Sequence, residues 1–219
     1  MNSLADQPAL TLYVDGSCLG NQNVDASTPA AWGLVVVVGD SGLGKGSGEL
    51  HHEEAGPVIT DPHQEGFIGA GVGSNNTAEL SGFAAALRWL LIEGGEEAAV
   101  IRADSTYAGN LASGVWKAKA NRELVAHVQA LWDEVAALRE LSWSHVKAHR
   151  GHRWNERADH LAARVLQLEH HLYPFVLKCL CEGHLTLATD QVNWHSPDRT
   201  LKSLSADRRL IKALKWPNR

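Results

Sequence analysis

The sequence predicts an α/β protein with a mixed sheet flanked by helices, followed by a C-terminal extension. Apolar, strand-like segments fill the first part of the chain, and strands then alternate with helical segments up to about residue 167. Beyond that point the pattern is irregular until the basic segment 196–219. The order of strands first, then helix, strand, helix, strand and helix implies a layered α/β structure.

The expected elements follow this order. Strands are expected over five segments, most of them rich in apolar and β-branched residues: 11–17, 31–38, 49–59, 98–104 and 141–147. A further short strand is expected near residues 67–72. Helices are expected over three segments: 75–95, 121–138 and 154–168. In the first helix, Asn76 is the expected cap and the pair Gly94–Gly95 the expected stop.

Composition is that of an ordinary globular protein. Of 219 residues, 44% are hydrophobic and 21% charged, and no run approaches eighteen apolar residues. The start MNSLADQPALTLY lacks the features of a signal peptide. We therefore expect a cytoplasmic protein that does not associate with membranes, although a nuclear or organellar location stays open. Three cysteines favour reduced thiols over a disulfide framework.

Charge is distributed unevenly along the chain. The net charge is −5, but residues 196–219 carry seven basic and two acidic side chains, which leaves −10 for the remainder. Two interpretations of this segment are compatible with each other. It forms a basic amphipathic helix packed by its apolar residues, or it contacts nucleic acid. The apolar residues are Leu201, Leu204, Ile211 and Leu214.

Four carboxylates stand at informative places. Asp15 and Asp104 each end an apolar strand, where ligand sites of α/β sheets gather, although a turn-forming Asp is the simpler explanation of each alone. Glu79 borders the apolar stripe of its helix, yet its spacing from Asn76 also fits a capping box. Asp159 lies in the first turns of a helix, where it complements the dipole. These explanations work singly but do not explain the set.

A convergence of the four carboxylates indicates a metal site. Four like charges on one side of a sheet repel one another unless divalent cations lie among them, and two magnesium ions would balance the charge. An oxygen-only ligand set favours magnesium or manganese over zinc. Two such ions, about 3.5–4 Å apart, suit in-line attack on a phosphodiester. The expected reaction is phosphodiester hydrolysis.

Four segments together resemble the type 1 ribonuclease H family: VDGSCLGN, SNNTAEL, ADSTY and HVKAHRGHRWNERADHLA. They occur in the family's order and span most of residues 10–165. The resemblance implies a ribonuclease H-like fold with a five-stranded mixed sheet, a catalytic domain over residues 8–167 and an extension over 168–219. It also implies magnesium-dependent endonucleolytic cleavage of the RNA strand of RNA–DNA hybrids. We expect a monomer without an obligate protein partner.

The resemblance also assigns site residues. The catalytic and metal-binding carboxylates are Asp15, Glu79, Asp104 and Asp159, and His149 would move protons and aid product release. Asp15 and Asp104 would bind or bridge the ions, while Glu79 and Asp159 complete one side each. Residues expected to contact substrate are Gly16, Ser17, Asn21, Asn75, Asn76, Ser105 and Asn155. Two roles are open for Asn155: it caps the last helix, or it orients a water.

Histidine and cysteine groups offer a competing zinc interpretation. His145, His149, His152 and His160 fall on a strand, a loop and a helix, so convergence on zinc is not expected. His145 is expected to pack against the sheet, and His152 and His160 to be structural or solvated. Cys179, Cys181 and His184 lack the spacing of a standard zinc finger, and a packed appendage is the default. Cys18 is expected in the core or in the cleft.

Three segments depart from the common bacterial pattern. Residues 18–33 form a longer loop, residues 39–73 an enlarged acidic segment without an evident purpose, and residues 107–123 leave no room for a basic helical handle. Two other functions remain open: a nuclease of the same fold that acts on another nucleic acid, and a non-catalytic nucleic-acid-binding module. The complete carboxylate set weighs against a binding module.

Overall fold

The computed structural model describes residues 10–20, 22–42, 44–148 and 150–167, and the backbone of residues 185–188 and 191–194. The chain divides into two compact units, Met1–Leu166 and Gln167–Arg219. The first unit contains a five-stranded sheet and nearly all of the described residues.

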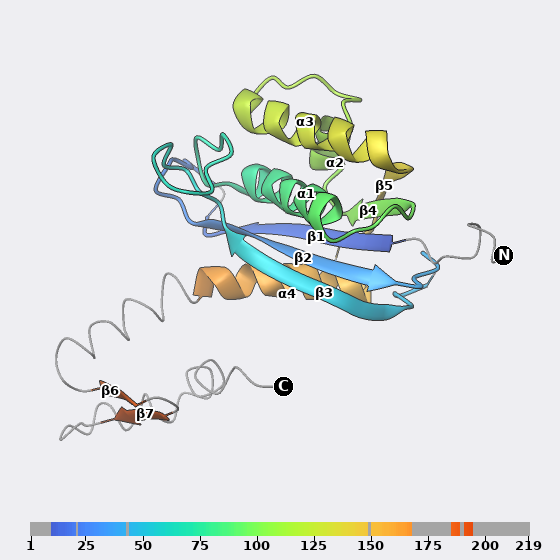
Figure 1. Ribbon diagram of the computed structural model, residues 1–219. Coiled ribbons are helices and arrows are strands. Elements are labelled where there is room, and N and C mark those ends of the chain that lie inside the picture. The colour runs from blue at the N-terminus through green and yellow to red at the C-terminus, as the bar shows by residue number, and fades with distance from the viewer. Residues whose placement is uncertain are drawn as a thin grey trace. The chain divides into compact units, whose positions relative to one another are not determined.

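The sheet of the first unit is mixed (Figure 1). Its strands are β1 (Leu10–Cys18), β2 (Ala30–Val38), β3 (Glu49–Pro57), β4 (Ala99–Ala103) and β5 (Leu141–His145), in the order β3-β2-β1-β4-β5. The first three strands are antiparallel neighbours, and β4 and β5 extend the sheet in parallel with β1. The predicted fold class is confirmed.

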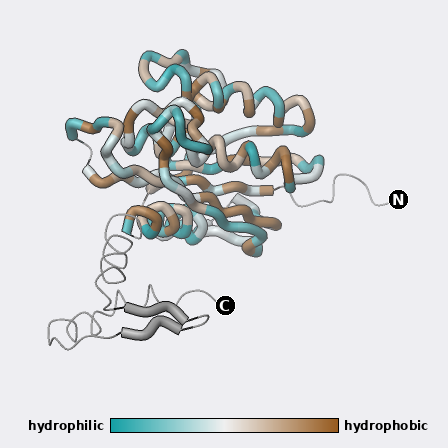
Figure 2. The backbone as a smooth tube through the Cα atoms, turned by 60° about the vertical axis from the view of Figure 1, so that its left-hand side comes forward, coloured by the Kyte–Doolittle hydropathy of each residue, from teal (hydrophilic) through white to brown (hydrophobic). Residues whose placement is uncertain are grey.

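Helices cover both faces of this sheet (Figure 1). Three of them lie on one face: α1 (Asn75–Ile92), α2 (Thr106–Ala112) and α3 (Arg122–Leu138). The opposite face is covered by α4 (Arg153–Gln167). Figure 2 shows hydrophobic segments along the strands between these layers.

The alternation of side chains along a strand explains the two layers. On β1, Leu12 and Val14 join the larger core beneath α1, whereas Tyr13 joins a smaller core beneath α4. Because both faces of the central strands are buried, their sequences are apolar almost without interruption. Unbroken apolar runs such as LVVVV therefore belong to the middle of the sheet.

Close packing of α4 depends on Gly33 of β2. A Cβ atom at this position would overlap the carbonyl oxygen of Ala158 and lie 3.0 Å from its carbonyl carbon. Gly33 pairs with Asp15 across the two strands, so α4 approaches the sheet directly beside Asp15. Any larger residue at position 33 would displace the helix from this position.

Three details differ from the prediction. Helix α1 is capped by Ser74, whose Oγ accepts from the Thr77 amide at 3.1 Å, so the predicted cap at Asn76 and its capping box with Glu79 are wrong. Residues 67–72 form no strand, although Ile68 and Ala70 pack in the core. The short helix α2 was not predicted. The other elements of the first unit lie within a few residues of their expected bounds.

The second unit contains a described hairpin of β6 (Leu185–Ala188) and β7 (Gln191–Trp194), which pair antiparallel. These two strands were not predicted from the sequence. Cys179, Cys181, His184 and the basic segment 196–219 lie outside the described residues. Among the described helices, none combines the length and apolar character needed to cross a bilayer.

Candidate active site

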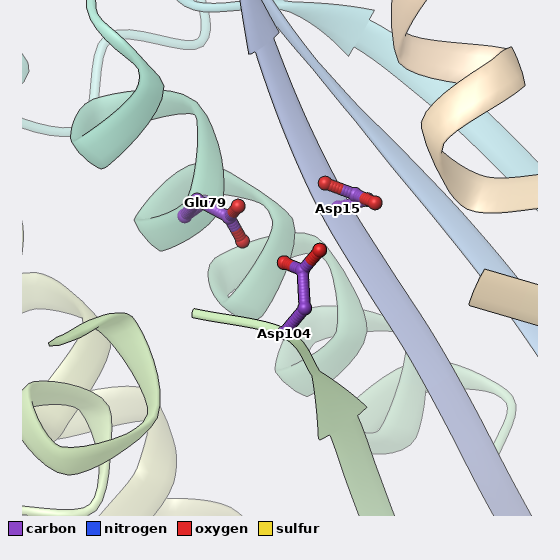
Figure 3. A group of neighbouring side chains, drawn as sticks. All are labelled: Asp15, Glu79 and Asp104. Atoms are coloured by element: carbon purple, nitrogen blue, oxygen red, sulfur yellow. The ribbon is translucent and has the colours of Figure 1, made fainter. Parts of the chain in front are cut away.

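Three carboxylates from three separate elements meet at one place (Figure 3). Asp15 lies on β1, Asp104 follows β4 directly, and Glu79 lies in the second turn of α1. Tyr13 pairs with Arg102 across the two parallel strands, so Asp15 and Asp104 each stand two residues beyond a paired position. One carboxylate oxygen from each of the three acids lies within 4.8 Å of the others. The strand register thus brings together two aspartates that are far apart in sequence.

The glycine after Asp15 allows Glu79 to approach. A Cβ atom at Gly16 would lie 2.5 Å from the amide nitrogen of Glu79 and 2.8 Å from the Cβ of Ala78. The amide of Gly16 also donates to Asp15 Oδ1 at 2.8 Å. Glycine at this position therefore lets the first half of α1 lie against β1 and holds one oxygen of Asp15.

Helix α4 brings two more polar groups to the site. Asp159 is half-buried and lines a pocket of about 300 Å³ together with the three other carboxylates. Asn155, one turn earlier, is buried and its Nδ2 donates to Asp15 Oδ2 at 3.2 Å. Because α4 begins at Arg153, Asn155 lies inside the helix, and the interpretation of Asn155 as a cap is wrong. Its spacing of four from Asp159 places both side chains on one face of the helix.

Burial and repulsion between the carboxylates disfavour negative charge at this site. Asp15 is 6% exposed, and burial, with further contributions from Asp104 and Asp159, raises its pKa to about 8. Glu79 is 7% exposed, and burial followed by the charges of Asp15 and Asp104 raises its pKa well above the usual range. Burial and like charges therefore favour the uptake of protons or cations at this site.

The chemistry of the ligands fits hard divalent cations. The converging atoms are all carboxylate oxygens, and Glu79 Oε2 is buried without a hydrogen-bond partner. Magnesium and manganese prefer such oxygen ligands. Within the part of the chain that the structure describes, Asp15, Glu79 and Asp104 form the only group of three such residues with metal-ligand spacing. No described histidine joins a zinc-type cluster.

The expected substrate residues are placed in different ways. Gly16, Ser17 and Asn75 line the pocket beside the carboxylates, and so does Cys18, as a cleft residue. Asn76 is exposed on the first turn of α1 and does not line the pocket.

Three further expected site residues do not line the pocket that the described residues form. Ser105 follows Asp104, and its Oγ accepts from the Ala108 amide at 3.1 Å, which caps α2. Asn21 and His149 lie outside the described residues.

The remaining histidines have separate surroundings. His145 is exposed at the end of β5, an edge strand of the sheet, so its predicted packing against the sheet is wrong. His160 is exposed on α4, as expected. His152 is buried and structural, with Nε2 3.3 Å from the hydroxyl of Tyr13. Burial lowers the pKa of His152.

Comparisons with known proteins identify the family. The RNase H family model matches residues 7–167. Ribonuclease H of Caulobacter sp. (strain K31) is 32% identical over 168 residues, which cover 71% of this chain and 88% of that protein. Ribonuclease H of Anaplasma marginale (strain St. Maries) is 30% identical over 172 residues, which cover 73% and 91%.

Solved structures share the fold. RNase H1 from Halobacterium salinarum NRC-1 superposes with a TM-score of 0.52 at 25% identity, covering 73% of this chain and 98% of that one. LC11-RNase H1, solved in complex with RNA/DNA hybrid, has a TM-score of 0.50 at 24% identity, covering 72% and 96%. The family model spans most of the chain and includes all four predicted carboxylates. The resemblance seen in the sequence is confirmed, and the chain belongs to the ribonuclease H family.

Proposed function

We propose that the protein hydrolyses the RNA strand of RNA–DNA hybrids endonucleolytically with two divalent cations, magnesium or manganese. The observation that carries this proposal is the convergence of Asp15, Glu79 and Asp104 in a pocket that Asp159 also lines. Membership of the family supports the enzyme class, a metal-dependent endoribonuclease. The monomeric state and the cytoplasmic location stay predictions.

The residues of the pocket have distinct roles in this reaction. Asp15, Glu79, Asp104 and Asp159 would hold divalent cations, which when bound activate a water and stabilise charge on the scissile phosphate. Asn155 fixes the orientation of Asp15 by donating to its Oδ2, and the Gly16 amide fixes its other oxygen. These two hydrogen bonds orient the carboxylate of Asp15, and they also favour its charged form.

Recognition of the RNA strand would come from polar groups beside the carboxylates. Ser17 and Asn75 line the same pocket and can accept or donate to a 2′-hydroxyl, the group that separates RNA from DNA. The solved complex of LC11-RNase H1 with RNA/DNA hybrid supports this choice of substrate. We propose in addition that His149 moves protons during turnover, because a histidine pKa near neutrality suits that role.

Cleavage of one labelled sequence in several forms tests the proposal. RNA–DNA hybrid, duplex RNA, duplex DNA and single strands are incubated with magnesium or EDTA. We expect magnesium-dependent cutting confined to the RNA of the hybrid. Asp15→Asn should lower the rate at least about a hundredfold, because it removes a carboxylate from the metal site. The matched control Asp133→Asn makes the same exchange at an exposed position of α3 and should leave the rate unchanged.

Two outcomes would contradict the proposal. If the protein binds the hybrid without cutting it, the interpretation as a non-catalytic nucleic-acid-binding module takes the place of the proposal. Equal cutting of other duplexes would indicate a nuclease of the same fold with a wider substrate range.

A further inference from the structure

The loop between β2 and β3 is organised around one carboxylate. Its described residues, 39–42 and 44–48, are here called the brace loop. Asp40 Oδ1 accepts from the Gly42 amide at 3.1 Å, the Ser47 amide at 3.2 Å and the Ser47 hydroxyl at 2.9 Å. Five glycines of the loop have φ between 71° and 99°, a region that favours glycine. The loop is thus a folded structure with Asp40 at its centre.

The brace loop holds the beginning of α4. Trp154 Nε1 donates to the Ser47 carbonyl at 2.6 Å, and the Arg153 amide donates to the Lys45 carbonyl at 2.8 Å. Gly46 faces the same residues, since a Cβ there would lie 2.9 Å from Trp154 Cδ1. Two hydrogen bonds and a close backbone approach therefore fix residues 153 and 154, which directly precede Asn155.

The same loop also contacts the two central strands. The buried hydroxyl of Tyr13 on β1 donates to Asp40 Oδ2 and lies 3.3 Å from His152 Nε2. Arg102 on β4 donates to the Gly42 carbonyl at 3.3 Å. Tyr13 and Arg102 pair across the strands, and each stands two residues before a carboxylate of the site. A single loop thus touches β1, β4 and the start of α4, three of the elements that carry the four carboxylates.

We propose that the brace loop, through Asp40, sets the position of Asn155 and Asp159 relative to Asp15 and Asp104. Asp40 and Tyr13 are positioning residues that act through α4 and touch neither substrate nor metal. The inference rests on the proposed function and gives a role to part of the enlarged segment 39–73. Its physical basis is that the Asn155–Asp15 hydrogen bond, at 3.2 Å, lies within one turn of the braced residues. A small displacement of that turn would break this bond.

Variants at Asp40 separate positioning from stability. Asp40→Ala removes the acceptor for four hydrogen bonds, whereas Asp40→Asn keeps an oxygen at the centre of the loop. We expect Asp40→Ala to lower kcat on the hybrid about tenfold with KM changed less than about twofold, and Asp40→Asn to restore kcat to within about threefold. The matched control is Gln129→Ala, which removes a hydrogen bond of 2.7 Å between α3 and α2 on the other face of the sheet.

A second readout does not depend on activity. The side-chain amide signal of Asn155 in an ¹H–¹⁵N spectrum reports its contact with Asp15. It should move in Asp40→Ala and stay in place in Asp40→Asn and Gln129→Ala. If Asp40→Ala does not fold, Tyr13→Phe takes its place, because it removes the hydroxyl between Asp40 and His152 and keeps the ring.

Each outcome decides the inference. An unmoved Asn155 signal with unchanged kcat in Asp40→Ala overturns it, and so does an equal loss of kcat in Gln129→Ala. If the wild-type protein fails to cut the hybrid, the proposed function alone fails, and the Asn155 signal still tests the brace.

Discussion

At the scale of single residues, Asp15 and Glu79 make the stability of the metal-free protein depend on pH. The pKa of Asp15 is raised to about 8, and that of Glu79 is raised as well, so the folded state binds protons that the unfolded chain releases. Between the unfolded pKa near 4 and the folded pKa, the free energy of unfolding must fall as pH rises. Below pH 4 both states are protonated and this effect is absent.

The prediction is a loss of a few kcal/mol of unfolding free energy between pH 5 and pH 8 in EDTA, at about 1.4 kcal/mol per unit of pKa shift. Urea unfolding of the wild-type protein and of Asp15→Asn measures it, and the variant should show a smaller slope because it cannot titrate at position 15. Magnesium at pH 8 should restore part of the lost stability, since it replaces the protons. Identical slopes for the two proteins would contradict the raised pKa.

At the scale of elements, the placement of α4 depends on a glycine in the facing strand. Gly33→Ala would force a Cβ against the carbonyl of Ala158, and we expect a loss of about 1–3 kcal/mol of unfolding free energy from this overpacking. The magnesium-induced rise in melting temperature should shrink as well, because Asp159 would move away from the site. Gly71→Ala is the matched control, since a Cβ there meets nothing within 4 Å. Equal effects of the two variants would show that the close approach of α4 is unimportant.

The long elements could be predicted from the sequence because their patterns are unambiguous. The β-branched run LVVVV favours a strand buried on both faces, and the spacing in residues 121–138 matches the observed α3 closely. The predicted cap of α1 was wrong because serine and asparagine both favour the cap position. Only the reciprocal hydrogen bonds between Ser74 and Thr77 select Ser74 over Asn76. The predicted strand near residues 67–72 was wrong because apolar residues also pack in the core when their backbone is irregular.

For the site, the sequence predicted carboxylates but not the contacts that hold them. Asp15, Glu79, Asp104 and Asp159 could be found because strand ends and helix faces have fixed periods. The bond from Asn155 to Asp15 joins residues 140 apart, and the bond from Tyr13 to Asp40 joins residues 27 apart. No local pattern specifies such pairs, because they depend on how close α4 and the brace loop lie to the sheet.

At the scale of the whole molecule, the charge asymmetry bears on substrate binding. Residues 1–195 carry −10 and would repel a polyanionic hybrid, while residues 196–219 carry +5. The family model matches residues 7–167, so the basic segment lies beyond the matched residues. We expect the basic segment to contribute to affinity for the hybrid, because the proposed catalytic carboxylates all lie within residues 15–159.

We therefore predict that deleting residues 168–219 raises KM for the hybrid about tenfold at low salt and leaves kcat within about twofold. The dependence of KM on salt should also become shallower, because fewer phosphate charges are neutralised. A full-length variant with Lys202, Arg209, Lys212 and Lys215 changed to Gln separates charge from bulk, and it should reproduce most of the effect. If KM and its salt dependence stay unchanged in both proteins, the basic segment makes no contact with the hybrid, and its apolar residues are left with a packing role alone.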